Sequence, residues 1–330
     1  FDTLIVLLRS SEGRCGAGEA TLLTGYTDET IGESWRHSCA LADALAGASR
    51  VEFVRRIREI AASLPFLSTS FMTALEALDA HPLLQVATPT RVPILGILNE
   101  IEAGALEEEI ERLLATGYRT LKVKVGFEVV GDLQRVARIQ SLVAGRARLR
   151  LDANQGYTAR QAQRFAGALD PAGIELFEQP CAAGDWDAHM SVVPYSTVPL
   201  MLDESIYGLD DIERAAQMKA ARYIKVKLMK LVSLDGLVEA IERIRLLGMV
   251  PVLGNGVACD LGCWMEACVA ARHIDNAGEM NGFLKPSAGV LAGPLEFESG
   301  AIVLKPGFVG LPDEAAFSRF ETARYRRRRA

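Results

Sequence analysis

This chain of 330 residues lacks several patterns, and each absence excludes a class of protein. No two of its six cysteines form a Cys-x-x-Cys pair, so we expect reduced thiols and a cytoplasmic protein. No apolar run approaches the roughly 18 uncharged residues that a membrane helix needs, which argues against a membrane partner. A formal net charge of −6 argues against a general nucleic-acid binder. What remains is a globular composition, with 49% apolar residues to form a large core.

From about residue 90 onward, short runs rich in β-branched residues alternate with amphipathic runs. Strands separated by helices at this spacing indicate βαβ units and a parallel sheet. Seven or eight such units within about 200 residues favour a closed α/β barrel over an open sheet. The expected helices are 105–117, 132–143, 159–169 and 233–248. The expected strands are 91–98, 120–126, 149–155, 174–180, 199–205, 223–229, 249–255 and 277–283.

The first 90 or so residues follow a different pattern. Two apolar runs joined by a Gly-containing turn predict antiparallel strands, and helical patterns follow them. We therefore expect an N-terminal α+β capping domain at 1–90, packed against a barrel at 91–305. The chain begins at Phe1 inside a strand-like run, FDTLIVLLRS, and we expect further residues to precede it.

Polar residues stand late in successive predicted strands of the barrel. In a parallel barrel the carboxyl ends of the strands carry the active site, so polar residues there matter more than polar residues elsewhere. In chain order these residues are Lys122, Lys124, Asp152, Asn154, Glu178, Asp203, Lys225 and Lys227.

Three of these residues are carboxylates, and one strand-helix unit separates each of them from the next. Asp152 and Glu178 are 26 residues apart, and Glu178 and Asp203 are 25 residues apart. This spacing places the three side chains at one height on neighbouring strands, where they repel each other unless a cation lies among them. Three hard oxygen ligands without a thiolate or an imidazole predict a Mg²⁺ site, with Mn²⁺ as a substitute.

The lysines occur in pairs two residues apart, so the members of each pair share one face of a strand. Lys122 and Lys124 can face the barrel mouth while Leu121 and Val123 face the outer helices. Lys225 and Lys227 repeat this pattern on the other side of the three acids. A nearby cation and partial burial both disfavour the ammonium form, so we expect a lowered lysine pKa that suits a base.

Each part also has a structural interpretation. Asp152 can cap the helix that follows DANQGYT, and Asp203-Glu204-Ser205 can be an ordinary capping stretch. A lysine in a strand is commonly an edge residue or one that extends to solvent. These explanations account for single residues, but not for five strand ends in succession that carry lysine, acid, acid, acid and lysine.

At these residues the sequence resembles the enolase superfamily, and within it the muconate lactonizing enzyme subgroup. The motifs that carry the resemblance are KVKVG (122–126), DANQGY (152–157), EQP (178–180), DES (203–205) and IKVKLMK (224–230). The resemblance implies a modified (β/α)₇β TIM barrel behind the cap, with 306–330 returning to the cap. It also implies a homo-oligomer and a cap loop, partly kept at 25–27, that shapes the substrate pocket.

The resemblance implies a role for each motif residue. The family's metal ligands match Asp152, Glu178 and Asp203, and its two acid/base lysines match Lys124 and Lys227. Lys122 would hold the substrate carboxylate or an enolate oxygen, with Asn154 and Glu204 in supporting positions. The shared chemistry is removal of the proton α to a carboxylate of a small-molecule substrate.

Departures from the family pattern bear on the substrate. Dipeptide epimerases show D-x-D-G at the last strand, whereas this chain has Glu279-Met280-Asn281-Gly282, which puts a dipeptide in doubt. Cycloisomerases usually carry an acid on the seventh strand, but here the acid is shifted to Asp260, which disfavours a cycloisomerase. The mandelate racemase branch has a histidine base on the seventh strand, whereas none of the four histidines here falls on a predicted barrel strand, which argues against that branch.

The first choice is therefore a racemase or epimerase of an amino acid or an N-substituted amino acid, in which Glu279 receives a cationic nitrogen. A dehydratase of a hydroxylated amino acid, such as a hydroxyproline, and a muconate-type cycloisomerase are the alternatives. Two interpretations from other functional classes stay open. One is a Schiff-base aldolase, which would not need three acids in register, and the other is a non-catalytic barrel that binds a ligand but does not convert it.

Overall fold

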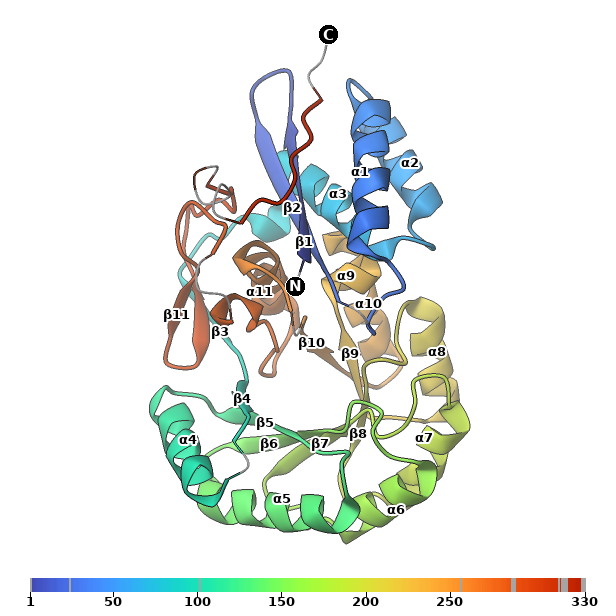
Figure 1. The fold of residues 1–330 in the computed structure, drawn as a ribbon, viewed down its shortest axis with the longest axis vertical. Coiled ribbons are helices and arrows are strands. Elements are labelled where there is room, and N and C mark those ends of the chain that lie inside the picture. The colour runs from blue at the N-terminus through green and yellow to red at the C-terminus, as the bar shows by residue number, and fades with distance from the viewer. Residues whose placement is uncertain are drawn as a thin grey trace.

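The computed structural model describes residues 2–23, 25–100, 102–255, 257–285, 289–313, 315 and 320–327. Figure 1 shows two parts, a curled sheet wrapped by helices and, above it, a cap made of a hairpin and the helices beside it. None of the helices in these ranges is both long and apolar enough to span a membrane.

The sheet of the larger part has seven parallel strands in the order β10-β9-β8-β7-β6-β5-β4. Its strands are β4 (Gly96–Leu98), β5 (Thr120–Lys124), β6 (Arg148–Asp152), β7 (Ile174–Glu178), β8 (Leu200–Leu202), β9 (Tyr223–Val226) and β10 (Val250–Leu253). The helices that follow them are α4 (Ala103–Ala115), α5 (Val129–Val143), α6 (Ala159–Ala168), α7 (Trp186–Val192), α8 (Leu209–Met218), α9 (Leu228–Leu231), α10 (Leu234–Leu246) and α11 (Asp260–His273).

A short segment after α11 joins the two edges of this sheet. Gly278 forms a parallel bridge with Ile94, next to β4, and Glu279 forms one with Gly254, next to β10. The amide of Gly278 donates to Pro93 at 3.0 Å, and that of Glu279 donates to Leu253 at 2.9 Å. The ring of strands is therefore closed by the segment that the sequence indicated at 277–283, and the barrel prediction is confirmed.

The alternation of side chains within β5 explains how a strand can carry two lysines. Leu121 and Val123 are buried to 1% exposure or less on the face toward the outer helices. Lys122 and Lys124 project from the opposite face, as the two-residue period of a strand requires. The apolar face supplies the burial that holds the strand in place, and this frees the other face for polar groups.

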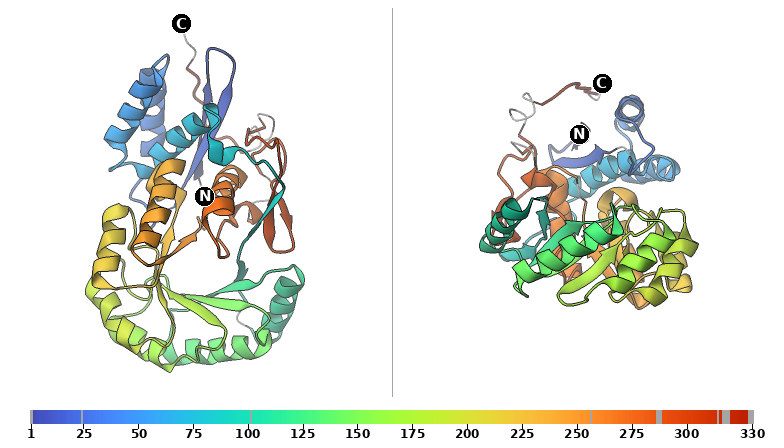
Figure 2. Two further views of the ribbon diagram at one scale, coloured as in Figure 1. Left: turned by 180° about the vertical axis from the view of Figure 1, so that it is seen from behind. Right: turned by 60° about the horizontal axis from the view of Figure 1, so that its bottom comes forward.

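The cap consists of a hairpin with helices beside it (Figure 2). Helices α1 and α3 pack against the hairpin, and α2 packs against α3. Strand β1 (Asp2–Arg9) pairs antiparallel with β2 (Cys15–Leu22), and α1 (Ile31–Leu45), α2 (Arg50–Ile60) and α3 (Pro65–Leu78) follow. Helix α3 packs so closely on β2 that a Cβ at Gly16 or Gly18 would lie 2.2 Å from a carbonyl oxygen of α3. Both glycines are therefore required for this contact.

Buried carboxylates of the cap hold the starts of two barrel helices. Glu19 of β2 accepts the amide of Cys259 at 2.8 Å, and Glu76 of α3 accepts the amide of Leu234 at 3.0 Å. Carboxylates are favoured at helix N-termini because the first amides lack partners and the helix dipole is positive there. Burial nevertheless raises the pKa of both Glu19 and Glu76 to about 7.

The structure corrects several predicted boundaries. The predicted strand 91–98 is two strands, because β3 (Thr90–Pro93) leaves the barrel and pairs with β12 (Ala301–Leu304) and through it with β11 (Glu296–Glu298). The predicted strand 223–229 ends at Val226, since α9 begins at Leu228. Helix α3 was not predicted at all. The domain limits stay a prediction, although Tyr325 does donate a hydrogen bond to Asp43 of α1 at 2.7 Å.

The close contact between β2 and α3 generates a stability prediction. Gly18→Ala should lower the free energy of unfolding by about 1–3 kcal/mol, because the added methyl group overlaps the Ser70 carbonyl and forces the helix outward. Urea unfolding measures this change. The control is Gly32→Ala in the exposed part of α1, where nothing lies within 4 Å and stability should be kept or raised. Equal stability of the two variants would contradict the packing argument.

Candidate active site

The residues predicted from strand ends lie together at the carboxyl end of the barrel. Lys124 of β5 is in register with Asp152 of β6, and Asp152 is in register with Glu178 of β7. Glu178 pairs with Met201 of β8, so Asp203 follows two residues later on the same face. The sheet order therefore places the three acids on adjacent strands, between the lysines of β5 and those of β9.

The three carboxylates are almost completely buried and share two lysine partners. Asp152, Glu178 and Asp203 are each exposed by 1% or less. The ammonium of Lys122 lies 2.8 Å from Asp152 Oδ2 and 3.2 Å from Glu178 Oε2. Lys225 lies 2.9 Å from Glu178 Oε1 and 3.5 Å from Asp203 Oδ2. Each lysine thus joins two neighbouring acids.

Glu279, on the segment that closes the ring, binds the same two lysines. Its two oxygens lie 3.1 and 2.8 Å from Lys122 Nζ, and Oε2 also contacts Lys225 Nζ. These ammonium groups outweigh burial and hold the pKa of Glu279 far below its usual range. Glu279 therefore serves as a counter-ion for Lys122 and Lys225 in this structure, rather than as a carboxylate open to a cationic nitrogen.

Lys124 and Lys227 stand at the two ends of the row of acids. Lys124 Nζ lies 2.6 Å from Asp152 Oδ2 and also contacts the side-chain oxygen of Asn154. Lys227 Nζ lies 2.8 Å from Asp203 Oδ2 and 4.0 Å from the centre of the Tyr26 ring, which belongs to the cap. The cap therefore contributes an aromatic face directly above one of the two lysines.

Charge balance sets the ionisation of the central groups. Burial alone would lower the pKa of Lys122, but Asp152, Glu178 and Glu279 hold it well above the usual value. Burial, with the neighbouring Asp152, raises the pKa of Glu178 to about 7, while the lysines oppose this shift. The pKa of Lys122 is thus shifted upward, opposite to the lowered lysine pKa that the sequence led us to expect.

Two further predicted residues form a supporting pair. Asn154 Nδ2 donates to Glu204 Oε1 at 2.8 Å, and the amide of Asn154 donates to Asp152 Oδ1 at 2.9 Å. The other oxygen of Glu204, Oε2, is buried without a hydrogen-bond partner among the described residues. Burial and the nearby Asp203 raise the pKa of Glu204. Asn154 therefore connects Glu204 with the first of the three acids.

The sequence analysis assigned no role to two groups that hold Asp203. Lys230 Nζ contacts the Asp203 carbonyl at 2.9 Å, and burial lowers the pKa of Lys230 to about 8. Gln179, with a φ of +39°, accepts the amide of Asp203 at 2.9 Å. Lys230 stands three residues after Lys227, which is one helical turn, and this spacing was a signal that could have been used.

Glu266 of α11 fixes the backbone just after Lys227. Its Oε1 accepts the amide of Leu228, the first residue of α9, at 3.1 Å. Its Oε2 accepts the side-chain amide of Asn255. Glu266 is 2% exposed, and burial raises its pKa to about 7. This carboxylate therefore holds the turn that presents Lys227 to the barrel mouth.

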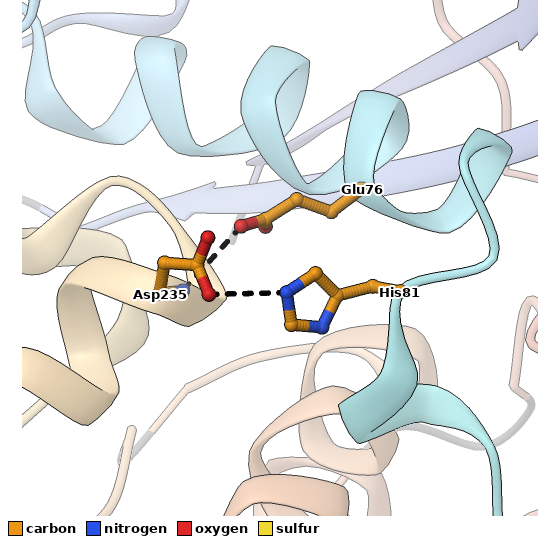
Figure 3. Close-up of side chains that lie close together, drawn as sticks. All are labelled: Glu76, His81 and Asp235. Carbon is orange, nitrogen blue, oxygen red and sulfur yellow. Dashed lines mark hydrogen bonds and ion pairs between the residues drawn. The ribbon is translucent and has the colours of Figure 1, made fainter.

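A second cluster of possible metal ligands lies where the cap meets α10 (Figure 3). Among the described residues, Glu76, His81 and Asp235 bring one ligand atom each within 4.8 Å of one another. The predicted acids do not converge in this way, since Lys122 and Lys225 lie between them. In the second cluster, however, Glu76 accepts the amide of Leu234, and His81 Nε2 bonds Asp235 at 3.1 Å. These bonds explain the cluster as a junction between the two parts.

Comparison with known proteins decides the family. The family model described as "Enolase C-terminal domain-like" matches residues 105–313, which is more than half of the chain. The chain belongs to the enolase superfamily. The resemblance to its muconate lactonizing enzyme subgroup is also confirmed, and with it the fold of a barrel behind an N-terminal cap.

Similar proteins include epimerases and racemases of amino-acid derivatives. An L-Ala-D/L-Glu epimerase of Clostridium acetobutylicum is 31% identical over 58% of this chain. The match spans about half (55%) of that relative's length. An N-succinyl-L-Arg/Lys racemase of Bacillus cereus is 26% identical over 89% of this chain and 80% of its own. These findings confirm the expectation of an isomerase-class enzyme of the superfamily.

Solved structures share the fold. A dipeptide epimerase from Cytophaga hutchinsonii, crystallised with Mg and the dipeptide D-Ala-L-Val, superposes with a TM-score of 0.86 at 22% identity. The match covers 96% of this chain and 90% of the other.

The buried carboxylate of Glu266 generates a pH prediction. Its folded pKa of about 7 exceeds the ordinary 4.5, so the folded state binds a proton in this window that the unfolded state does not. Raising the pH from 5 to 8 should therefore lower the free energy of unfolding of the wild type, relative to that of Glu266→Gln, by up to about 3 kcal/mol. Urea unfolding at both pH values measures the difference, with Glu108→Gln on the exposed face of α4 as control. Parallel pH profiles for wild type and Glu266→Gln would contradict the assignment.

Proposed function

We propose that this enzyme is a Mg²⁺-dependent racemase or epimerase of an N-acylated amino acid, which acts by removing the proton α to the carboxylate. One observation carries the proposal: Lys124 and Lys227 lie at opposite ends of the same row of acids. A substrate bound over that row has one lysine on each face. The epimerases and the racemase among the relatives support this reaction class.

The state of Glu279 supports an acylated nitrogen over a free ammonium group. Both of its oxygens are already bonded to Lys122, and Oε2 contacts Lys225 as well. A substrate ammonium would have to compete with these two cations for the carboxylate. A neutral amide nitrogen brings no positive charge next to them, and so avoids this repulsion.

Asp152, Glu178 and Asp203 would hold the metal ion. The chemistry of the donor set fits Mg²⁺, because the site offers buried carboxylate oxygens and no thiolate or imidazole. The sharing of Lys122 and Lys225 between neighbouring acids shows that these oxygens already gather around positive charge. When bound, Mg²⁺ would supply charge stabilisation for the substrate carboxylate during removal of the α-proton.

The two flanking lysines divide the proton transfer. In one direction Lys124 Nζ takes the α-proton from one face and Lys227 Nζ returns a proton to the other face. In the reverse direction the roles exchange, which makes the reaction a racemisation or an epimerisation. A dehydratase or a cycloisomerase needs only one of these transfers, so the paired arrangement favours the racemase.

The remaining residues prepare the site for the charge that develops. Lys122 is buried and keeps its proton, so its ammonium is available to stabilise the enolate oxygen. Tyr26 of the cap covers Lys227 and keeps bulk water from that face. Glu266 holds the turn after Lys227, which limits the movement of this lysine.

Lysine variants test the two-sided mechanism. Lys124→Ala and Lys227→Ala should each lower racemisation by about 10²–10⁴-fold. Each variant should still exchange the α-proton of one enantiomer with deuterium, without inversion, and the two variants should prefer opposite enantiomers. ¹H NMR in D₂O with each enantiomer of an N-acyl amino acid measures both effects. The control is Lys305→Ala, a surface lysine paired with Glu296. Loss of exchange for the same enantiomer in both variants would contradict two-sided transfer.

Metal affinity tests the three acids separately from turnover. Asp203→Asn should weaken Mn²⁺ binding by about a hundredfold, since a ligand contributes at least as much as the groups that orient it. Asp235→Asn, in the cluster of Figure 3, is the matched control and should bind Mn²⁺ like the wild type. Titration calorimetry measures both affinities. EDTA should abolish α-proton exchange, and Mg²⁺ should restore it. Weaker binding in Asp235→Asn alone would move the metal to the second cluster.

A further inference from the structure

The two lysines at the ends of the row of acids differ in how far they are covered. The side chain of Lys227 is 2% exposed, whereas that of Lys124 is 41% exposed. Part of this difference comes from the cap, since the ring of Tyr26 lies over the ammonium of Lys227 at 4.0 Å. The cap therefore covers one of the two lysines and leaves the other partly open to solvent.

Tyr26 belongs to loop 25–30, which lies between β2 and α1 and is held at two points. Within the cap, the carboxylate of Glu29 accepts two amides at the start of α3, at 2.7 and 3.0 Å. From the barrel, the hydroxyl of Tyr207 donates to the backbone carbonyl of Tyr26. The first contact stays inside the cap, and the second joins the loop to the barrel directly.

Tyr207 is itself held firmly in the segment that follows β8. Its amide donates to Asp211 Oδ2 at 2.8 Å, and its ring lies 4.1 Å from the ammonium of Lys230. The same ammonium contacts the carbonyl oxygens of Asp203 and Ile206, each at 2.9 Å. Burial and nearby carboxylates raise the pKa of Tyr207 to about 12, so the hydroxyl keeps the proton that it donates. Tyr207 therefore presents its hydroxyl to the cap from a fixed position.

The ring of Tyr26 completes the confinement of Lys227. On one side the ammonium lies 2.8 Å from Asp203 Oδ2, and on the other it meets the aromatic ring. An ammonium is attracted to an aromatic face, and more strongly where water is excluded. Without the ring, Lys227 would be held from one side only. A misplacement of about 1 Å in a reacting group can cost about a hundredfold in rate.

We propose that Tyr207 is a positioning residue of the reaction and acts, through Tyr26, on proton transfer by Lys227 alone. Its hydroxyl holds the Tyr26 ring over Lys227. Lys124, at the opposite end of the row of acids, takes no part in this contact. The inference rests on the proposed function, which assigns proton transfer to both lysines. It adds that the two faces of the substrate are controlled separately.

Exchange measured for each enantiomer tests this role. In Tyr207→Phe, α-proton exchange should slow about tenfold for one enantiomer of N-acetylphenylalanine, the one that Lys227→Ala fails to exchange. The other enantiomer should exchange at the wild-type rate but with less inversion, because return of a proton by Lys227 is slowed. ¹H NMR in D₂O with Mg²⁺ measures both rates. The control is Tyr195→Phe, which removes the hydroxyl of a tyrosine just after α7 that is 59% exposed.

A double variant tests whether Tyr207 acts through Tyr26. Tyr26→Leu removes the ring but keeps the backbone carbonyl, so it should slow exchange of the same enantiomer. Adding Tyr207→Phe should then slow it no further, since the hydroxyl has no ring to hold over the lysine. The inference is overturned if Tyr207→Phe slows neither enantiomer or both alike, or if the effects of the two substitutions multiply.

Hydrogen exchange followed by mass spectrometry separates this contact from the proposed function. The amide of Tyr26 donates to Leu23 at 3.0 Å, and that of Glu29 donates to Thr27 Oγ1 at 3.1 Å, so both amides are protected. In the protein without metal or substrate, Tyr207→Phe should speed their exchange by up to about tenfold. If the wild type exchanges the α-proton of neither enantiomer, the proposed function fails. The amide exchange alone then decides whether Tyr207 holds the loop, and an unchanged rate overturns this as well.

Discussion

The buried contacts between lysines and carboxylates are the constraint on which the active site depends. Four acids and the two lysine pairs of the strand ends meet at the barrel mouth, and all of these groups except the part-exposed Lys124 are buried. A buried charge of this set without a partner would cost several kcal/mol. The acids are Asp152, Glu178, Asp203 and Glu279, and the lysines are Lys122, Lys124, Lys225 and Lys227. Because each group neutralises its neighbours, the set can be buried together and held in a fixed geometry.

The rest of the fold keeps this set in place through carboxylates that hold the starts of helices. Glu19 and Glu76 connect the cap to α11 and α10, and Glu266 connects α11 to the turn after Lys227. Burial raises the pKa of each to about 7, so these contacts are made at an electrostatic cost. Because Glu19 of the cap holds the start of α11, and α11 carries Glu266, the cap is linked to the placement of Lys227, a proposed catalytic lysine.

The sequence predicts the part of this architecture that follows from local periodicity. The two-residue period of TLKVK shows which side chains face the barrel, and regular spacing places the acids on neighbouring strands. Contacts that join distant segments leave no such local pattern. Glu279 meets Lys122 across 157 residues, and the exit of β3 from the barrel depends on pairing with β12. Lys227 was expected within a strand, yet it precedes α9, because Glu266 holds the amide of Leu228 there.

The position of the bound metal ion tests this account most directly. Crystals of the enzyme soaked with Mn²⁺ give an anomalous signal that locates the ion without reference to activity. The account predicts a peak between Asp152, Glu178 and Asp203, with Lys122 and Lys225 displaced from at least one of these carboxylates. A peak at Glu76, His81 and Asp235, with none at the barrel mouth, would contradict it.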